Sequence, residues 1–190
     1  KNMPELLDEL TGIAHGAHVK FEDVVAANLF YELLHTQPVE RITRFFGWGE
    51  ECTSVAAIGD ATADKKSIAG MNVDATSRDR TERIIVSAKP SGYNSYLSEG
   101  SPLIAGIKGI NNKGLTLVGA GVQTSDGVKA YMQRKTVGIP VLLLSKVVHE
   151  RCNNIGEAIQ LLKEIKLRGY LGQNLVMVDS KDNIACVEIS

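Results

Sequence analysis

Cys52 stands where a chain-terminal nucleophile could arise. It begins a short β-prone run directly after residues 47–51, a segment of glycine, tryptophan and glutamate. If the bond between Glu51 and Cys52 were cut, the new α-amine, with an unperturbed pKa of about 7.7–8.0, could serve as the base for its own thiol. Cysteine is also common as a small buried apolar residue, so a catalytic and a structural interpretation are both open.

Asn72 and Asp74 form a second candidate pair. They flank Val73 at the end of the next predicted strand. Because side chains alternate along a strand, Asn72 and Asp74 point to the same face. The two strands predict a hairpin whose open end could bring Asp74 beside Cys52, where a carboxylate would hold an α-ammonium group. A hydrogen-bonded turn at the strand end is an equally open interpretation.

The histidines offer a route to cysteine chemistry without cleavage of the chain. The four are His15, His18, His35 and His149. A thiol that is not chain-terminal would need a separate base, and the spacing favours none of the four. The chain has no HExxH motif and no spacing typical of metal ligands, so we predict no metal site.

The remaining candidates are interpreted as structural. Ser54 lies two residues after Cys52 in the same predicted strand, and Cys152 and Cys186 lie far away in sequence. Three cysteines without a CxxC pair form neither a metal motif nor a disulfide framework. Glycine is frequent between residues 106 and 121, but no nucleotide-binding motif opens a helix there. We therefore predict turns, close sheet packing and no cofactor.

The composition of the chain argues against several classes of protein and of binding partner. The 190 residues are 44% hydrophobic and carry 21 Lys and Arg against 22 Asp and Glu. This balance argues against disorder, and it predicts no nucleic-acid partner and no anionic membrane surface. No apolar run approaches the ~20 residues of a membrane-spanning helix. Because the first residue is Lys1 rather than Met, we expect that a preceding segment has been removed, and the compartment stays open with a slight preference for the cytoplasm.

Hydrophobic periodicity predicts the strands and the first helices. Apolar spacing typical of helices covers residues 6–14 and 21–34, and the period then changes to that of strands. Predicted strands cover residues 52–58, 67–73, 83–88, 103–108, 115–122, 175–178 and 184–189. Segregated blocks of helices and strands predict one α+β domain with layered antiparallel sheets.

Two later helices have recognisable ends. Pro140 suits the first position of a helix that runs to about Arg151. Asn154 can cap the next helix, with Glu157 three residues on, and Gly169 is expected to end it.

Five segments in order along the chain carry a combined signal. They are ELTGIAHGAHVKFEDVVAANLFYEL (9–33), ECTSVA (51–56), AGMNVDA (69–75), GINNKGLTLVGAGV (109–122) and GQNLVMVDSKDNIACVEIS (172–190). Together they resemble the acyl-coenzyme A:6-aminopenicillanic acid acyltransferase family of N-terminal nucleophile hydrolases, which is related to the choloylglycine hydrolases. The resemblance of each segment is weak alone, but five such segments in the same order along the chain are specific for the family.

The resemblance implies a four-layer αββα sandwich made as an inactive precursor. Residues 1–51 would be a helical pro-segment or α-chain, and residues 52–190 the β-chain part, the two staying associated after self-cleavage between Glu51 and Cys52. Cys52 would then be nucleophile and, through its amine, base. Asp74 would orient the amine, and Asn72 would shape the pocket or donate a hydrogen bond.

The implied activity is hydrolysis of a linear small-molecule amide, or transfer of its acyl group, through a thioester. No coenzyme A signature is readable, and a homo-oligomer is compatible with the resemblance. The chain departs from the family at Glu51, where Gly is usual, and at Val73, where Trp is usual. The family places a further Asn beyond a strand like 184–189, so we expect a missing C-terminal tail. These departures support an alternative, an inactive binding or scaffold protein on the same fold.

Overall fold

In the computed structural model of the chain, residues 3–29, 51–74, 83–100, 108–123, 138–168 and 171–189 are described. The chain divides into two compact units, residues 1–49 and 50–190. Parts of the predicted helix 21–34 and strand 103–108 lie outside the described residues. No helix in the described part of the chain is long and apolar enough to cross a membrane.

In the described part of the first unit, residues 3–29, helices α1 (Pro4–Ala17) and α2 (Phe21–Asn28) contact each other. Pro4 begins α1 in the first turn, where its missing N–H costs no hydrogen bond. The apolar spacing buries Leu10 and Ala14, as predicted. His18 ends the helix in the left-handed conformation, with φ of 57°.

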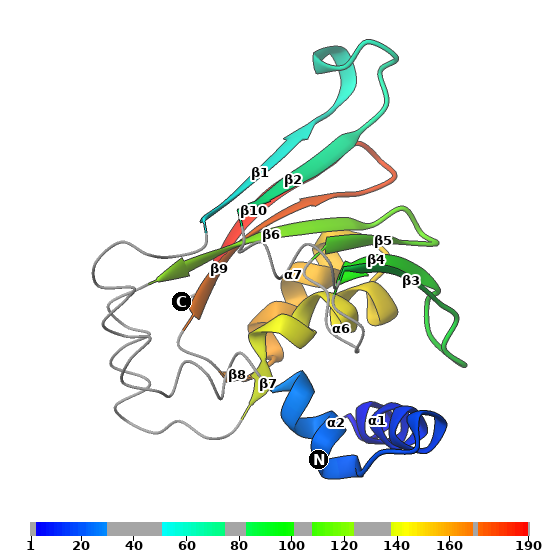
Figure 1. The fold of residues 1–190 in the computed structure, drawn as a ribbon. Helices are drawn as coiled ribbons and strands as arrows, with labels where there is room; N and C mark the ends of the chain where they lie inside the picture. Colours follow the sequence, from blue (N-terminus) through cyan, green and yellow to red (C-terminus); the bar gives the residue numbers. More distant parts are fainter. Residues whose placement is uncertain are drawn as a thin grey trace. The chain divides into compact units, whose positions relative to one another are not determined.

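The second unit is built on a six-stranded antiparallel sheet (Figure 1). Its spatial order is β10-β9-β6-β5-β4-β3. The strands are β3 (Ile84–Ala88), β4 (Tyr96–Gly100), β5 (Lys108–Asn111), β6 (Thr116–Gln123), β9 (Leu171–Val178) and β10 (Ile184–Ile189). The prediction missed β4 and began β9 four residues late, whereas β3, β6 and β10 agree with the predicted strands to within a residue.

A hairpin of β1 (Glu51–Ala57) and β2 (Ile68–Asp74) lies against β6 and β9 (Figure 1). The predicted hairpin is therefore confirmed. Its connection contains a short 3-10 turn, Gly59–Ala61, in which Gly59 has a φ of +54° that favours glycine.

Helices α6 (Leu144–Arg151) and α7 (Ile155–Glu164) pack on the other face of the six-stranded sheet. The core between them joins side chains of both layers: Leu115, Leu117, Leu144, Val148, Cys152, Ile155, Ala158, Leu175 and Met177. The predicted cap of α7 is confirmed, because Asn154 Oδ1 accepts a hydrogen bond from the Glu157 N–H at 3.0 Å.

Two predicted helix ends are wrong. Pro140 does not begin a helix, because it belongs to the two-residue strand β7 (Ile139–Pro140) and has extended backbone, with ψ of 135°. A 3-10 turn, Val141–Leu143, intervenes before α6. Gly169 does not end α7 either, because α7 stops at Glu164 and β8 (Leu167–Arg168) then pairs in parallel with β7.

The described part of residues 50–190 therefore forms three layers: the β1–β2 hairpin, the six-stranded sheet and the α6–α7 pair. The predicted α+β class with antiparallel sheets is confirmed, with β7–β8 as a small parallel addition. The face of the six-stranded sheet that is turned toward the hairpin, called here the inner face, is where the candidate site lies.

Candidate functional site

Cys52 lies near the start of β1, with its side chain turned toward the inner face of the sheet. It pairs with Val73 of β2, and directly opposed residues share a face. Burial alternates accordingly: Cys52 and Ser54 are partly buried, whereas Thr53 and Val55 are exposed. The hairpin thus directs the thiol into the space between the two sheets.

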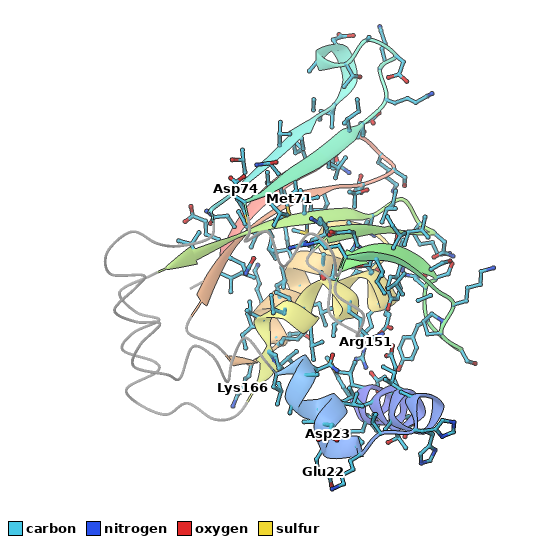
Figure 2. All side chains as sticks on the ribbon, viewed as in Figure 1. Glu22, Asp23, Met71, Asp74, Arg151 and Lys166 are labelled. Carbon is cyan, nitrogen blue, oxygen red and sulfur yellow. The ribbon has the colours of Figure 1, made fainter. Side chains whose placement is uncertain are left out.

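Asn72 and Asp74 lie on the opposite, exposed face of the hairpin. Asn72 Nδ2 donates a hydrogen bond to Asp74 Oδ1 at 2.6 Å, so the predicted common face is confirmed. Figure 2 labels Asp74 at the end of β2. Asp74 pairs with Glu51, which places the Glu51–Cys52 peptide bond beside the Val73–Asp74 bond. Asp74 is therefore one step from Cys52 in the register of the hairpin, with its carboxylate on the exposed face and the thiol on the other face.

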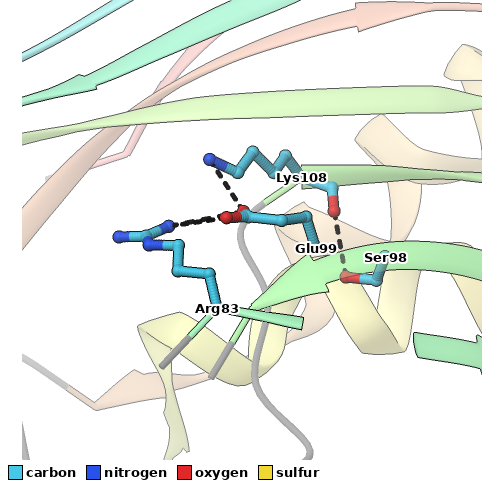
Figure 3. A network of polar contacts seen from close by, with 4 residues as sticks. All are labelled: Arg83, Ser98, Glu99 and Lys108. Carbon is cyan, nitrogen blue, oxygen red and sulfur yellow. Dashed lines mark hydrogen bonds and ion pairs between the residues drawn. The ribbon is translucent and has the colours of Figure 1, made fainter. Parts of the chain in front are cut away.

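Three charged side chains, Arg83, Glu99 and Lys108, form a cluster on the inner face of the sheet (Figure 3). Lys108 Nζ lies 2.7 Å from Glu99 Oε2, and Arg83 Nη1 lies 3.1 Å from Glu99 Oε1. Arg83 precedes β3, Glu99 is on β4 and Lys108 begins β5, so three adjacent strands bring the charges together. We call these residues the charge cluster.

The orientation of the charge cluster follows from its neighbours in the strands. Tyr96 on β4 stacks on His149 of α6, with ring centroids 6.0 Å apart, so its side of the strand is the helix side. Glu99 is three residues on and points the opposite way. Lys108 pairs with Glu99 and shares its face.

The surroundings of Lys108 shift the pKa of its ammonium group. Burial lowers the pKa of the Lys108 ammonium group, and the Arg83 guanidinium lowers it further. The Cys52 sulfur acts in the opposite direction, because a thiolate stabilises the ammonium. Sequence reasoning missed all three members of the charge cluster, since nothing in their spacing shows that three strands bring them together.

Ser54 adds a polar group to the same space. Its Oγ is buried and has no hydrogen-bond partner among the described residues. An unsatisfied buried hydroxyl costs about 1–3 kcal/mol, so it is a group available to a ligand. The structural interpretation of Ser54 as a strand residue is confirmed by its position in β1.

A second polar cluster lies on the helix side of the sheet. Lys146 of α6 forms an ion pair with Glu150 and donates a hydrogen bond to the Tyr96 hydroxyl at 3.0 Å. His149 beside them is fully buried, and burial lowers its pKa to about 4. The sheet separates His149 from Cys52, so it is not placed to act as a base for that thiol. His15 and His18 belong to the first unit, and His35 lies outside the described residues.

The three cysteines are unbonded and differ in environment. Cys152 is buried in the helix–sheet core, where burial, followed by the Glu157 carboxylate, raises its thiol pKa to about 12. Its predicted structural role is consistent with that position. Cys186 was predicted to be structural too, but it is exposed on β10, because it points away from the core side of its strand.

Metal-binding geometry is not found in the described residues: no group of three or more His, Cys, Asp or Glu side chains there could hold an ion. The described residues present a thiol and a hydroxyl on β1 that point toward the inner face of the sheet, and two cations and one carboxylate that point out of that face. Such a set can hold negative charge and can expose a thiol to an electrophile.

Comparison with solved structures finds distant similarities. Penicillin V acylase from Agrobacterium tumefaciens is 13% identical, with a TM-score of 0.34, covering 74% of this chain and 42% of that one. A variant of conjugated bile acid hydrolase from Clostridium perfringens is 11% identical, with a TM-score of 0.31, covering 73% and 43%. The chain thus spans about two fifths of the length of these structures. Among curated proteins, none matches its sequence.

Family comparison gives the decisive match. The family described as acyl-coenzyme A:6-aminopenicillanic acid acyl-transferase matches residues 61–190, more than half of the chain. The matched region contains Asn72, Asp74 and all three members of the charge cluster, and it begins nine residues after Cys52. The chain belongs to the acyl-coenzyme A:6-aminopenicillanic acid acyl-transferase family.

Proposed function

We propose that Cys52 is the nucleophile of an amide hydrolase or acyltransferase and that it becomes chain-terminal by self-cleavage after Glu51. The observation that carries this proposal is the position of Cys52: its partly buried thiol points toward the face of the sheet that bears the charge cluster, and the residue before it, Glu51, pairs with Asp74. Family membership supports the reaction class.

The proposed self-cleavage uses the register of the hairpin. The Cys52 sulfur attacks the carbonyl carbon of Glu51, the bond from that carbon to the Cys52 nitrogen breaks, and a thioester replaces the amide. Water then attacks the thioester and releases a carboxylate on Glu51, a free thiol and a new α-amine on Cys52. Asp74 is opposite Glu51, and in this proposal its carboxylate would hold the ammonium form of that amine.

The proposed catalytic cycle repeats this chemistry on a substrate. The α-amine takes the thiol proton, the thiolate attacks the substrate carbonyl, and the proton passes to the departing amine. Water resolves the resulting thioester in a hydrolase, and a second amine resolves it in an acyltransferase. Hydrolysis of a linear amide is the favoured outcome. Asn72, hydrogen-bonded to Asp74, would fix the carboxylate.

The wider proposal follows the family. The four-layer αββα sandwich would be completed by a further helical layer beyond the three layers of residues 50–190. Residues 1–51 would remain bound as a separate chain after cleavage, and the substrate would be a small molecule. No cofactor enters any step, since each bond change is made by groups of the chain and by water.

Intact mass and amino-terminal sequencing of the purified full-length protein test the proposal. We expect a species that begins Cys-Thr-Ser-Val and a separate peptide that ends at Glu51. Cys52→Ala is expected to stay uncut and inactive on amides, whereas the matched control Cys186→Ser should be cut and active. A wild-type chain that stays uncut and leaves amides intact after long incubation would favour the binding-protein interpretation.

A further inference from the structure

We propose that Lys108, held by Glu99 and supported by Arg83, is an anion-recognition residue of the Cys52 site, and that the site takes amides with a carboxylate close to the scissile carbonyl. This inference deepens the proposed function and rests on it. It names the substrate class that the inner face of the sheet can recognise.

The first argument is a charge count. The charge cluster contains two cations and one carboxylate, so one positive charge remains after Glu99 is counted. A cross-strand pair of Glu and Lys stabilises two adjacent strands without a third charged residue. Arg83 contacts both oxygens of the same carboxylate, at 3.1 and 3.3 Å, and adds a charge that the sheet does not require.

The second argument is burial. Lys108 is 17% exposed and Glu99 is 24% exposed, and burial lowers the Lys108 pKa, which means that its charge is held there at a cost. Charges interact more strongly at such a site than on an open surface. An incoming carboxylate would therefore be stabilised more strongly here than by an exposed lysine.

The third argument is the neighbourhood of the nucleophile. The Cys52 thiol points toward the inner face of the sheet, and Lys108 and Glu99 point out of that same face, so an anion held by Lys108 would lie on the side of the sheet where the reacting bond is. Ser54, two residues after Cys52 on the same face, has a buried hydroxyl with no partner among the described residues. A carboxylate could accept a hydrogen bond from this hydroxyl and a charge-assisted one from Lys108.

Alkylation of Cys52 provides a test that needs neither self-cleavage nor a known substrate. Iodoacetate and iodoacetamide both transfer a CH₂ group to the thiolate and release iodide, but only iodoacetate carries a carboxylate. The ratio of their rate constants is independent of the fraction of thiolate, since both reagents need the same thiolate. We would measure this ratio in the Cys186→Ser background, where buried Cys152 does not compete.

Replacing Lys108 by Met removes the charge and keeps the length of the side chain. We expect the iodoacetate-to-iodoacetamide ratio to fall by about three- to tenfold, the size expected for one charge near the reacting atoms of a half-buried site. Glu99→Gln should raise the ratio, because it leaves both cations without their carboxylate. The matched control, Lys113→Met in the exposed turn after β5, should leave it unchanged.

A merely structural charge cluster would alter thermal stability and leave the ratio constant, so unchanged ratios in Lys108→Met and Glu99→Gln would overturn the inference. If Lys108→Met does not fold, Glu99→Gln decides alone. A different measurement tests the proposed function: it is wrong if the protein cleaves neither succinyl-4-nitroanilide nor butyryl-4-nitroanilide, whatever the alkylation ratios are. If both are cleaved, wild type should prefer the succinyl compound and Lys108→Met should lose that preference.

Discussion

Mild acid should destabilise the second unit through one histidine. His149 is fully buried against Gly109 and Tyr96, and neither ring nitrogen has a hydrogen-bond partner of good geometry among the described residues. Burial lowers its pKa to about 4, against smaller opposing effects of the Gly109 and Ser145 carbonyl groups. We therefore predict that His149 stays neutral in the folded protein until well below pH 6.

The sign and size of the effect follow from linkage. The folded pKa of about 4 is below the ordinary value of 6.5, so the unfolded chain binds the proton first as the pH falls. The contribution of neutral His149 is complete above pH 6.5, is lost between pH 6.5 and 4, and changes no further below that. The full loss is about 3 kcal/mol and the loss by pH 5 is about 2 kcal/mol.

Urea denaturation followed by circular dichroism at pH 7.5 and pH 5.0 measures this loss. His149→Phe keeps a ring beside Tyr96 without a titrating group, and we expect its free energy of unfolding to fall by about 2 kcal/mol less than that of wild type. His15→Gln, on the exposed side of α1, is the control and should behave as wild type. Asp179 has a lowered pKa and loses its own stabilising effect only below about pH 4, outside this range. Equal pH dependence in wild type and His149→Phe would refute the reasoning.

Three further substitutions test the packing, each by urea denaturation at pH 7.5. Asn111→Leu should cost about 3–4 kcal/mol, because the buried amide makes four hydrogen bonds, two of them to carbonyl groups at the end of α6; Asn112→Ala, in the exposed turn, should cost little. Gly109→Ala should cost about 3 kcal/mol, since a Cβ would lie 2.5 Å from the Leu97 carbonyl oxygen, and a wild-type stability would contradict this packing. Asn154→Ala should cost about 1 kcal/mol through loss of the α7 cap, and Asn154→Ser should restore most of it.

Local chemistry made some elements predictable. The spacing of Asn154 and Glu157 places both partners of a cap within one turn of helix, and no distant residue is needed to form it. The alternation in β1 and β2 likewise follows from the chain itself, and the structure pairs them from Glu51 with Asp74 through to Ala57 with Ile68. Such elements depend on interactions that the sequence displays directly.

Elements that depend on distant neighbours were missed or misplaced. The sequence of β4, YLSEG, is short and contains both a charge and a glycine, so it has little strand signal. It is a strand because β3 and β5 pair with it on both sides. Pro140 shows the same dependence, since the pairing of Ile139 with Leu167 holds the backbone extended where local preference allows a helix.

The residues of the candidate site also differ in whether local sequence or distant strand pairing brings them together. Cys52, Asn72 and Asp74 could be named from sequence because they belong to one hairpin. Arg83, Glu99 and Lys108 could not, because each comes from a different part of the chain and only the order of β3, β4 and β5 brings them together. A charged residue next to a strand is ordinarily solvated, and the partial burial of these side chains is what changes their chemistry.

The pleat of the hairpin also constrains how Asp74 can contribute to the proposed reaction. Cys52 shares a face with Val73, and Asp74 is one residue further along and points to the opposite face. A carboxylate on that face cannot take the thiol proton directly, but Asp74 pairs with Glu51, the residue whose bond to Cys52 would be cut. In the proposed mechanism, therefore, Asp74 reaches the thiol only through the amine that cleavage releases. An uncut chain would hold its nucleophile and its carboxylate on the two faces of one hairpin, without the base that connects them.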